Sequence, residues 1–512
     1  MKHASQDQPA YIYTALAAVL VMAAIYRFYG IDQQSLWVDE LWGTLVALRI
    51  SVVGMLYQVY LYDSHPFGYH FVLRFSEWLG GDSELALRAP SAMAGILLVL
   101  VVFRTAKEFL SASCGLLAAA LVAMSYYAVF FSQEARANML LALFCMLNIK
   151  YLLALVINGD AQFKNRFGFV VSAVCAAYLH YSGVVFSVVS YALLLAYSIK
   201  PFSWRAIRAW CWLVVVAIVL YAPALPGLWR SLTMNFGEQW LVPNLAAVWG
   251  TLVFWLGPNK HVTAAYAVLA LLALPISLAF RAAREKKHGP VLLAIAVAAL
   301  MPPTLFLIKS LFSVSAYNHR NFIAGLPLLL ILTAYPLAAV VEAISKPLIK
   351  KVAVLGAVLG VVGLQFWQNS TTEGYNLYAS RRNHDIRGAV QLLKDWEFDN
   401  KKTPIIVSHE YFDFYVRSEG LRDISNLYYT DAQNVGAVSN YLDWRGFKEF
   451  YFLEIVEDNR LEKTERFKAL ESHFLYRCVA RFAWVDVWHF SASAPETLPQ
   501  PAPNDCLVKA GG

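Results

Sequence analysis

Charge is scarce in this chain. Lys, Arg, Asp and Glu together supply 15% of its 512 residues, whereas soluble domains carry about 25%. Hydrophobic residues supply 59%. So little charge excludes a set of ordinary soluble domains, and we expect a polytopic α-helical membrane protein.

Familiar nucleotide and zinc motifs are absent as well. The sequence has no Walker loop, no G-x-G-x-x-G after a strand and no C-x-x-C pair. These absences argue against a nucleotide-driven enzyme and against a structural zinc site. The basic residues are spread through loops between apolar runs, and no basic tract indicates a nucleic-acid site. We therefore expect no nucleic-acid partner.

Cysteine is also sparse. The chain has six cysteines, and four of them lie in apolar runs, where a thiol usually behaves as a small buried hydrophobe. Cys478 and Cys506 fall in the polar C-terminal part. A bridge between them requires an oxidising compartment, and the sequence leaves open whether they form one.

Eleven apolar runs have roughly the length, about 20 residues, that a helix needs to cross a hydrocarbon core. The predicted spans are 11–29, 88–110, 113–131, 138–157, 167–183, 184–199, 209–225, 262–280, 290–308, 322–341 and 351–368. The first has no convincing cleavage site after it and is interpreted as an uncleaved signal anchor.

The loops between these spans alternate in charge. Lys and Arg are concentrated in every second loop, such as 281–287, and the positive-inside rule makes those loops cytoplasmic. The extracytoplasmic parts are then 30–87, 132–137, the turn at 183, 226–261, 309–321 and the chain after 369. We expect a multi-pass protein of the inner (plasma) membrane with an exported C-terminal domain.

Two domains are predicted. Residues 1–369 form a transmembrane domain, and the runs 41–60 and 66–79 of its first outer loop, 30–87, fit helices lying in the membrane interface. Residues 370–512 form a small soluble α/β domain with a Pro-rich tail from residue 492. Its predicted helices are 385–396 and 460–470, and its predicted strands are 404–408, 447–455 and 483–490.

Polar residues able to carry chemistry gather in the outer loops. Asp39 and Glu40 lie between tryptophans just beyond the first span. The other groups are Asp63-Ser64-His65-Pro66, Ser132-Gln133-Glu134-Ala135-Arg136, His180-Tyr181-Ser182, Lys260 and Tyr317-Asn318-His319-Arg320-Asn321. Each alone has an ordinary explanation, such as an interfacial turn, a snorkelling Arg or a packed His. Their occurrence on one predicted side argues for a shared site, because ionisable residues near hydrocarbon are costly.

Two kinds of chemical group are present in this set. Carboxylates accept a proton from a hydroxyl or hold a divalent cation. Groups that bind a phosphate are offered by Arg136, Arg320, His319 and Lys260. This pairing suits transfer of a group from a phosphate leaving group to a hydroxyl. Nucleotide-activated donors are generally not found outside the cytoplasm, so a lipid-linked donor explains why many spans accompany one site.

Four motifs resemble those of a known family. They are Ser-x-Trp-x-Asp-Glu at 35–40, His-Pro-x-x-Tyr at 65–69, Gln-Glu-Ala-Arg at 133–136 and His-Tyr-Ser-Gly at 180–183. Together they are similar to the GT-C glycosyltransferases of the protein-O-mannosyltransferase and aminoarabinose-transferase superfamily, over about the first 370 residues. Two departures are His65-Pro66-Phe67, where the family commonly has His-Pro-Pro, and Arg320-Asn321, where it usually has Arg-Tyr.

The resemblance implies an inverting glycosyltransferase that moves a sugar from a polyprenyl-phosphate carrier to an acceptor hydroxyl on the outer side. Asp39 would activate the acceptor, Glu40 would support it or bind a metal, and Glu134 would lie close by. Arg136 and Arg320 would stabilise the departing lipid phosphate. The remaining substrate-binding candidates are His65, His180, Tyr181, Lys260 and His319. Some family members depend on a divalent cation, for which Asp39 and Glu40 are the candidate ligands. The sugar and the acceptor are not specified.

Two other functions are considered. A transporter or flippase of lipid-linked glycans is expected to carry charges near the middle of its spans and internal repeats. In this chain the charges cluster at span ends, and no convincing repeat is present. A catalytically inactive scaffold is disfavoured because the Asp-Glu and Gln-Glu-Ala-Arg motifs are intact.

The alternation of Lys and Arg makes a topology prediction. Reporters fused after Asn369 and within 226–261 are expected to report an extracytoplasmic location, and one near Lys286 a cytoplasmic location. A phosphatase and fluorescent-protein fusion pair measures this directly. A cytoplasmic C-terminal domain would overturn the orientation and with it the shared outer site.

Overall fold

The computed structural model describes residues 10–199, 203–233, 244–279, 288–312, 317–371, 384–395, 403–418, 429–456, 464–482, 484–491 and 507–508. The chain divides into two compact units. We call Met1–Ile31 with Ile50–Ser380 the membrane unit, and Asp32–Arg49 with Arg381–Gly512 the C-terminal unit. The domain boundary at residue 369 stays a prediction. The structure adds that the segment carrying Asp39 and Glu40 belongs to the C-terminal unit.

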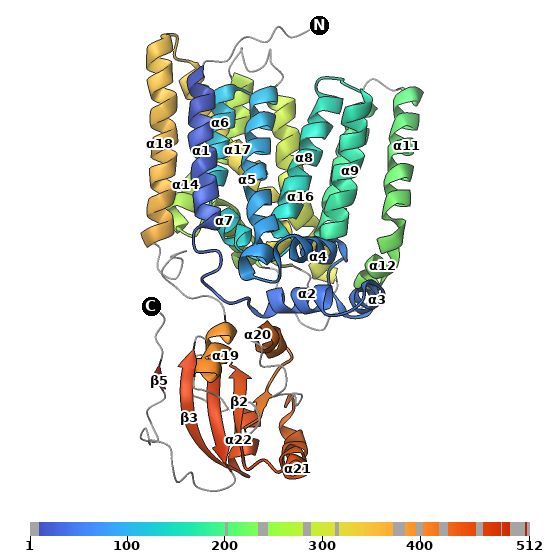
Figure 1. Cartoon of the computed structure of the whole chain (residues 1–512). Helices are drawn as coiled ribbons and strands as arrows, with labels where there is room; N and C mark the ends of the chain where they lie inside the picture. Colours follow the sequence, from blue (N-terminus) through green and yellow to red (C-terminus); the bar gives the residue numbers. More distant parts are fainter. Residues whose placement is uncertain are drawn as a thin grey trace. The chain divides into compact units, whose positions relative to one another are not determined.

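Long helices lie side by side in the membrane unit, and α4 crosses one end of them (Figure 1). Two short helices follow the first span, α3 (Val52–Tyr62) and α4 (Gly68–Gly80). The others are α1 (Ala10–Phe28), α5 (Glu84–Phe109), α6 (Ala112–Met124), α7 (Tyr126–Ser132), α8 (Asn138–Val156), α9 (Phe163–Leu179), α10 (Tyr181–Ser198), α11 (Trp204–Tyr221), α12 (Leu225–Thr233), α13 (Leu245–Leu256), α14 (Lys260–Ala279), α16 (His288–Phe312), α17 (Gly325–Glu342) and α18 (Pro347–Thr371).

The predicted polytopic helical fold is confirmed. Within the described residues, nine helices are long and apolar enough to cross a membrane, and the pair α6 and α7, bent by 58°, makes up to ten. The remaining predicted span, 167–183, overlaps α9, a helix of 17 residues that falls just short of the length used for a span. The predicted break at residue 183 is misplaced, because α9 ends at Leu179 and His180 has an extended backbone.

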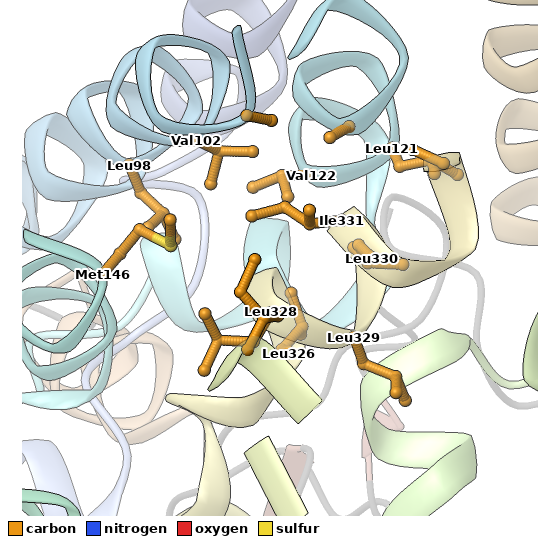
Figure 2. Packing of buried hydrophobic residues seen from close by; sticks show 14 of the residues in the cluster. Leu98, Val102, Leu121, Val122, Met146, Leu326, Leu328, Leu329, Leu330 and Ile331 are labelled. Atoms are coloured by element: carbon orange, nitrogen blue, oxygen red, sulfur yellow. The ribbon is translucent and has the colours of Figure 1, made fainter. Parts of the chain in front are cut away.

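The core of the membrane unit is built around α6 and α17. Every residue of α6 from Ser113 to Met124 is buried. Figure 2 shows leucine, valine and methionine side chains of α5, α6, α8 and α17 meeting there, among them Leu98, Val122, Met146 and Leu328. Lipid tails are as apolar as these side chains, so close packing rather than escape from water selects the arrangement. Gly115 shows this: a Cβ there would lie 2.7 Å from the Phe103 carbonyl oxygen of α5.

The bend between α6 and α7 frees backbone carbonyls, and a carbonyl within a span needs a donor from the protein. Arg27 of α1 donates to the carbonyls of Val122 and Ala123 at 3.2 and 2.9 Å. Asn369 of α18 donates to the carbonyl of Met124 at 2.9 Å. Arg27 is fully buried, and its charge also suits the negative end of the α6 dipole. The first and last spans thus stabilise the break together.

The C-terminal unit is an α/β domain, as predicted. Its five-stranded sheet has the order β1-β2-β4-β3-β5, in which β1 is parallel to β2, β5 is parallel to β3, and β4 is antiparallel to β2 and β3. The strands are β1 (Ile405–Val407), β2 (Glu449–Ile455), β3 (Leu475–Phe482), β4 (Val485–Ser491) and β5 (Leu507–Val508). The helices are α2 (Val38–Leu48), α19 (Ile386–Asp395), α20 (Phe412–Ser418), α21 (Val435–Arg445) and α22 (Glu465–Glu471).

Aromatic residues cover one face of this sheet. Phe450 pairs with Phe490 and Phe452 with Trp488 across β2 and β4. Phe467 of α22 packs on the two β4 residues, and its ring centroid lies 4.4 Å from that of Trp488 and 5.6 Å from that of Phe490. All predicted elements of this part are present where they are described, and β3, β5, α20 and α21 are additional. The Cys478 side chain and Cys506 lie outside the description, so their bridge is not tested.

Loss of the Arg27 guanidinium is expected to destabilise the membrane unit. In Arg27→Met the carbonyls of Val122 and Ala123 lose their donor, and a buried unsatisfied polar group costs about 1–3 kcal/mol. Thermal unfolding in detergent, followed by tryptophan fluorescence, should show a lowered midpoint. Arg104→Met, at an exposed position of α5, is the matched control. Equal midpoints for the two variants would contradict the role given to Arg27.

Candidate functional site

A buried carboxylate lies at the C-terminal end of α3. Asp63 Oδ1 accepts hydrogen bonds from the backbone N–H of His65 at 2.8 Å and from His65 Nδ1 at 3.0 Å. His70 Nε2 of α4 lies 3.4 Å from the other oxygen, Oδ2. Burial alone would raise the pKa of Asp63, but the contacts with His65 and His70 outweigh it and hold this pKa well below its usual range. Asp63 is therefore ionised, and His65 Nδ1 carries a proton.

A second imidazole faces the first. His180 lies between α9 and α10, and its ring centroid is 4.9 Å from that of His65. His180 Nδ1 accepts hydrogen bonds from the backbone N–H of Ser182 at 3.0 Å and from its hydroxyl at 2.8 Å. Because a backbone N–H can only donate, His180 Nδ1 accepts through its lone pair and carries no proton. The proton of the neutral ring is therefore on Nε2. His65 Nδ1 thus carries a proton and His180 Nδ1 does not, so His180 offers an Nε2–H donor.

The surroundings keep His180 neutral. Burial lowers its pKa well below the ordinary value, and the nearby charges of His65 and Arg136 lower it further, while Asp63 opposes them. Arg136 is half-buried between α7 and α8. Its backbone carbonyl accepts a hydrogen bond from Ser91 of α5 at 2.9 Å. The membrane unit therefore gathers three of the predicted substrate-binding residues, His65, Arg136 and His180.

Two glycines explain how these helix ends come together. A Cβ on Gly183 of α10 would overlap the carbonyl of Ala176 in α9, and a Cβ on Gly68 of α4 would overlap that of Tyr178. The backbones of α4 and α10 can therefore approach the end of α9 only with glycine at these positions. This close approach brings the residues just before each helix, including the two imidazoles, into contact.

Helix α12 closes another side of this group. Arg230 Nη1 donates to the carbonyls of Tyr60 at 3.1 Å and Asp63 at 3.2 Å. Tyr181 lies against the same helix, where a Cβ on Gly227 would come within 2.8 Å of its hydroxyl oxygen. Arg230 and Tyr60 were not among the candidates from the sequence, whereas Asp63 belonged to the polar group 63–66 but was given no role of its own.

The Gln-Glu-Ala-Arg motif, residues 133–136, forms the loop between α7 and α8. Gln133 Nε2 donates to the carbonyls of Tyr26 at 3.1 Å and Tyr29 at 2.9 Å, at the end of α1. Glu134 is buried, and its carbonyl accepts a hydrogen bond from the backbone N–H of Arg136 at 2.8 Å. The first residue of the motif therefore fixes the loop that presents the last.

A second polar group is formed by α13 and the residues before α17. Thr251 Oγ1 lies 2.7 Å from the Tyr317 hydroxyl and 3.0 Å from His319 Nδ1. Burial lowers the pKa of His319. Arg320 and Lys260 are exposed.

Asp39 and Glu40 lie in the first turn of α2, in the C-terminal unit. Glu40 is fully buried, and its Oε2 accepts a hydrogen bond from the backbone N–H of Trp37 at 3.1 Å, as in a helix cap. Asp39 is half-buried. Burial lowers the pKa of His384, and the charge of Asp39 opposes this effect. Burial raises the pKa of Tyr411, and the charges of Glu410 and Asp39 raise it further.

The fit of a divalent cation to Asp39 and Glu40 is poor in the described residues. One Glu40 oxygen is already engaged with a backbone N–H. No group of three or more His, Cys, Asp and Glu residues in the described part of the chain is placed to hold a metal ion. Metal binding by this pair stays a prediction, and no step below uses it.

Comparison with known proteins agrees with this architecture. Residues 64–227, which include His65, Arg136 and His180, match the family model of dolichyl-phosphate-mannose-protein mannosyltransferase. ArnT from Cupriavidus metallidurans in the apo state is similar, with a TM-score of 0.58 and 15% identity over 96% of this chain and 99% of that one. ArnT bound to undecaprenyl phosphate gives 0.58 and 14% over the same shares.

A third solved structure is more distant. The oligosaccharyltransferase from Archaeoglobus fulgidus in the apo form gives a TM-score of 0.50 and 10% identity over 88% of this chain and 70% of that one. A search of curated proteins finds no match. The resemblance seen in the sequence is confirmed, and the chain is a multi-span membrane protein with the fold of the GT-C glycosyltransferases.

The tautomer of His180 is directly measurable. We expect its imidazole to remain neutral, with the proton on Nε2, at pH 6, where a free imidazole with a pKa of about 6.5 is mostly charged. Nitrogen-15 NMR of histidine-labelled protein, assigned with His180→Gln, reports this state. A protonated His180 ring at pH 6 would show that burial does not control this site.

Proposed function

We propose that this protein is a membrane glycosyltransferase that moves a sugar from a polyprenyl-phosphate carrier to an acceptor hydroxyl on the extracytoplasmic face. The observation that carries the proposal is the group of His65, His180 and Arg136 at the ends of the spans. The family match over the same residues and the fold shared with ArnT, whose structure is known with undecaprenyl phosphate, support it.

This group suits the phosphate of a lipid. His180 presents an Nε2–H, and Arg136 adds a planar cation that can bind two phosphate oxygens. The phosphate of a polyprenyl phosphate lies at the end of an apolar chain that stays in the membrane. A site at the ends of the spans can therefore bind the phosphate while the chain remains in the lipid. These groups are fixed before the leaving group develops charge, which is the condition for effective electrostatic stabilisation.

The acceptor side is assigned to Asp39. In the proposed step the acceptor oxygen bonds to the anomeric carbon while the bond from that carbon to the phosphate oxygen breaks. Asp39 accepts the hydroxyl proton, and the bonding pair leaves with the polyprenyl phosphate, whose charge Arg136 and Arg320 balance. Direct displacement of this kind inverts the anomeric configuration. Glu40, held in the helix cap, keeps α2 in place and is a supporting residue.

The alternative, a flippase for the same lipid, is separable by experiment. Detergent micelles have no two leaflets, so transport cannot occur in them, whereas transfer can. The purified protein is therefore assayed in micelles with undecaprenyl-phosphate-linked hexoses and pentoses and with envelope lipids and glycans of the source cell as acceptors. Release of free undecaprenyl phosphate that depends on added acceptor favours the transferase.

Asp39→Asn is the decisive variant in that assay. The amide is nearly isosteric but cannot accept the proton, so release of undecaprenyl phosphate should fall by about 10²–10⁴-fold. Binding of undecaprenyl phosphate alone, measured by tryptophan quenching, should be unchanged. Asp431→Asn, at an exposed residue of the same unit, is the matched control. Wild-type release by Asp39→Asn would remove Asp39 from the mechanism.

A further inference from the structure

The segment that carries Asp39 is bound to residues about 350 positions further along the chain. Arg387 Nη1 donates to the carbonyl of Asp32 at 3.0 Å, and its Nη2 donates to that of Gln33 at 2.9 Å. A guanidinium has five N–H donors in a fixed plane, and two neighbouring carbonyls held by one fork define a backbone direction. Arg387 is the second residue of α19, so this direction is set by the C-terminal domain.

Ser35 continues the same connection. Its hydroxyl donates to Asp385 Oδ1 at 3.2 Å and accepts from the backbone N–H of Arg387 at 3.1 Å. Asp385 Oδ1 also accepts from the backbone N–H of Gly388 at 3.0 Å, as an N-cap does. Ser35 is buried, and its hydroxyl adds two hydrogen bonds to the N-terminal cap of α19.

The next residue is held by another helix. The backbone N–H of Leu36 donates to the Tyr415 hydroxyl of α20 at 2.7 Å, and Leu36 is fully buried. Beyond α2, the Arg49 guanidinium lies over the ring of Phe414, 5.6 Å from its centroid. The segment is therefore fixed on both sides of α2 by residues of α19 and α20.

These contacts determine where Asp39 is placed. Leu36 is three residues before Asp39, and the hydrogen bond from the backbone N–H of Trp37 to Glu40 Oε2 spans Asp39 at the start of α2. The backbone has no free turn between the last contact and the carboxylate. His384, next to Asp385, feels the charge of Asp39, so the same stretch that holds the loop also borders the carboxylate.

We propose that Ser35, Asp385, Arg387 and Tyr415 are positioning residues for Asp39, and that the C-terminal domain takes part in catalysis by holding this carboxylate. The inference rests on the proposed function of Asp39 as the base. It gives the domain a task beyond stability. Because proton transfer needs the two heavy atoms within about 2.6–3.2 Å, a small displacement of the loop is enough to slow the reaction.

Two conservative variants test it. Ser35→Ala removes the hydroxyl shared by Asp385 and Arg387, and Tyr415→Phe removes the acceptor of the Leu36 N–H. Release of undecaprenyl phosphate in the micelle assay should fall by about 10–100-fold in kcat. The KM for the lipid-linked sugar and the binding of undecaprenyl phosphate should stay unchanged. Arg417→Gln, which breaks an ion pair with Asp413 on α20, is the control with wild-type kcat expected.

A double-mutant comparison separates positioning from stability. If Ser35 acts through Asp39, then Ser35→Ala should cause no further loss in an Asp39→Asn background, because the group it positions is already gone. An equal loss in both backgrounds would overturn the proposal, as would wild-type kcat in both Ser35→Ala and Tyr415→Phe. Wild-type release by Asp39→Asn alone would instead remove the proposed function of Asp39.

Discussion

A backbone carbonyl inside a membrane span has neither water nor lipid to bond with, and this constraint shapes the membrane unit. The bend between α6 and α7 is possible because Arg27 and Asn369 supply the missing donors. After α7, the Gln133 side chain donates hydrogen bonds to the carbonyls of Tyr26 and Tyr29 at the end of α1. The two joints depend on each other, and the loop that carries Glu134 and Arg136 starts from them.

The polar residues at the span ends are positioned by close backbone contacts at glycines. Gly68 and Gly183 let two helices begin against the end of α9. The resulting contact places His65, whose Nδ1 donates to the ionised Asp63, beside His180, whose Nδ1 accepts from the Ser182 N–H. A neutral donor beside a cation is a suitable surrounding for a phosphate, because it binds the anion without adding repulsion to Arg136.

Much of this was available from the sequence, for physical reasons. Spans are long apolar runs, so the helical fold followed from local composition. The motif residues His65, Arg136 and His180 were visible as polar groups beside hydrocarbon. Asp63 was named in the polar group 63–66 without a role, because its part in holding His65 depends on burial, which spacing does not reveal.

Other features depend on distant contacts. Arg27 looks like an ordinary basic residue at a helix end, and only the bend in α6 and α7 makes it a cap. Glu40 was assigned to catalysis or metal binding, and the structure shows its hydrogen bond to the Trp37 N–H. The attachment of Ser35 to Asp385 joins residues 350 positions apart, and no local pattern predicts such a pair.

The measurement that tests the central claim most directly is the pool of lipid-linked sugars in cells that lack the protein. If the protein is a glycosyltransferase with a polyprenyl-phosphate-linked donor, cells that lack it cannot consume this donor. Mass spectrometry should then find one polyprenyl-monophosphate sugar accumulating. The wild-type gene should restore the pool, and the Asp39→Asn variant should not. An unchanged lipid pool, or full restoration by Asp39→Asn, would contradict the account.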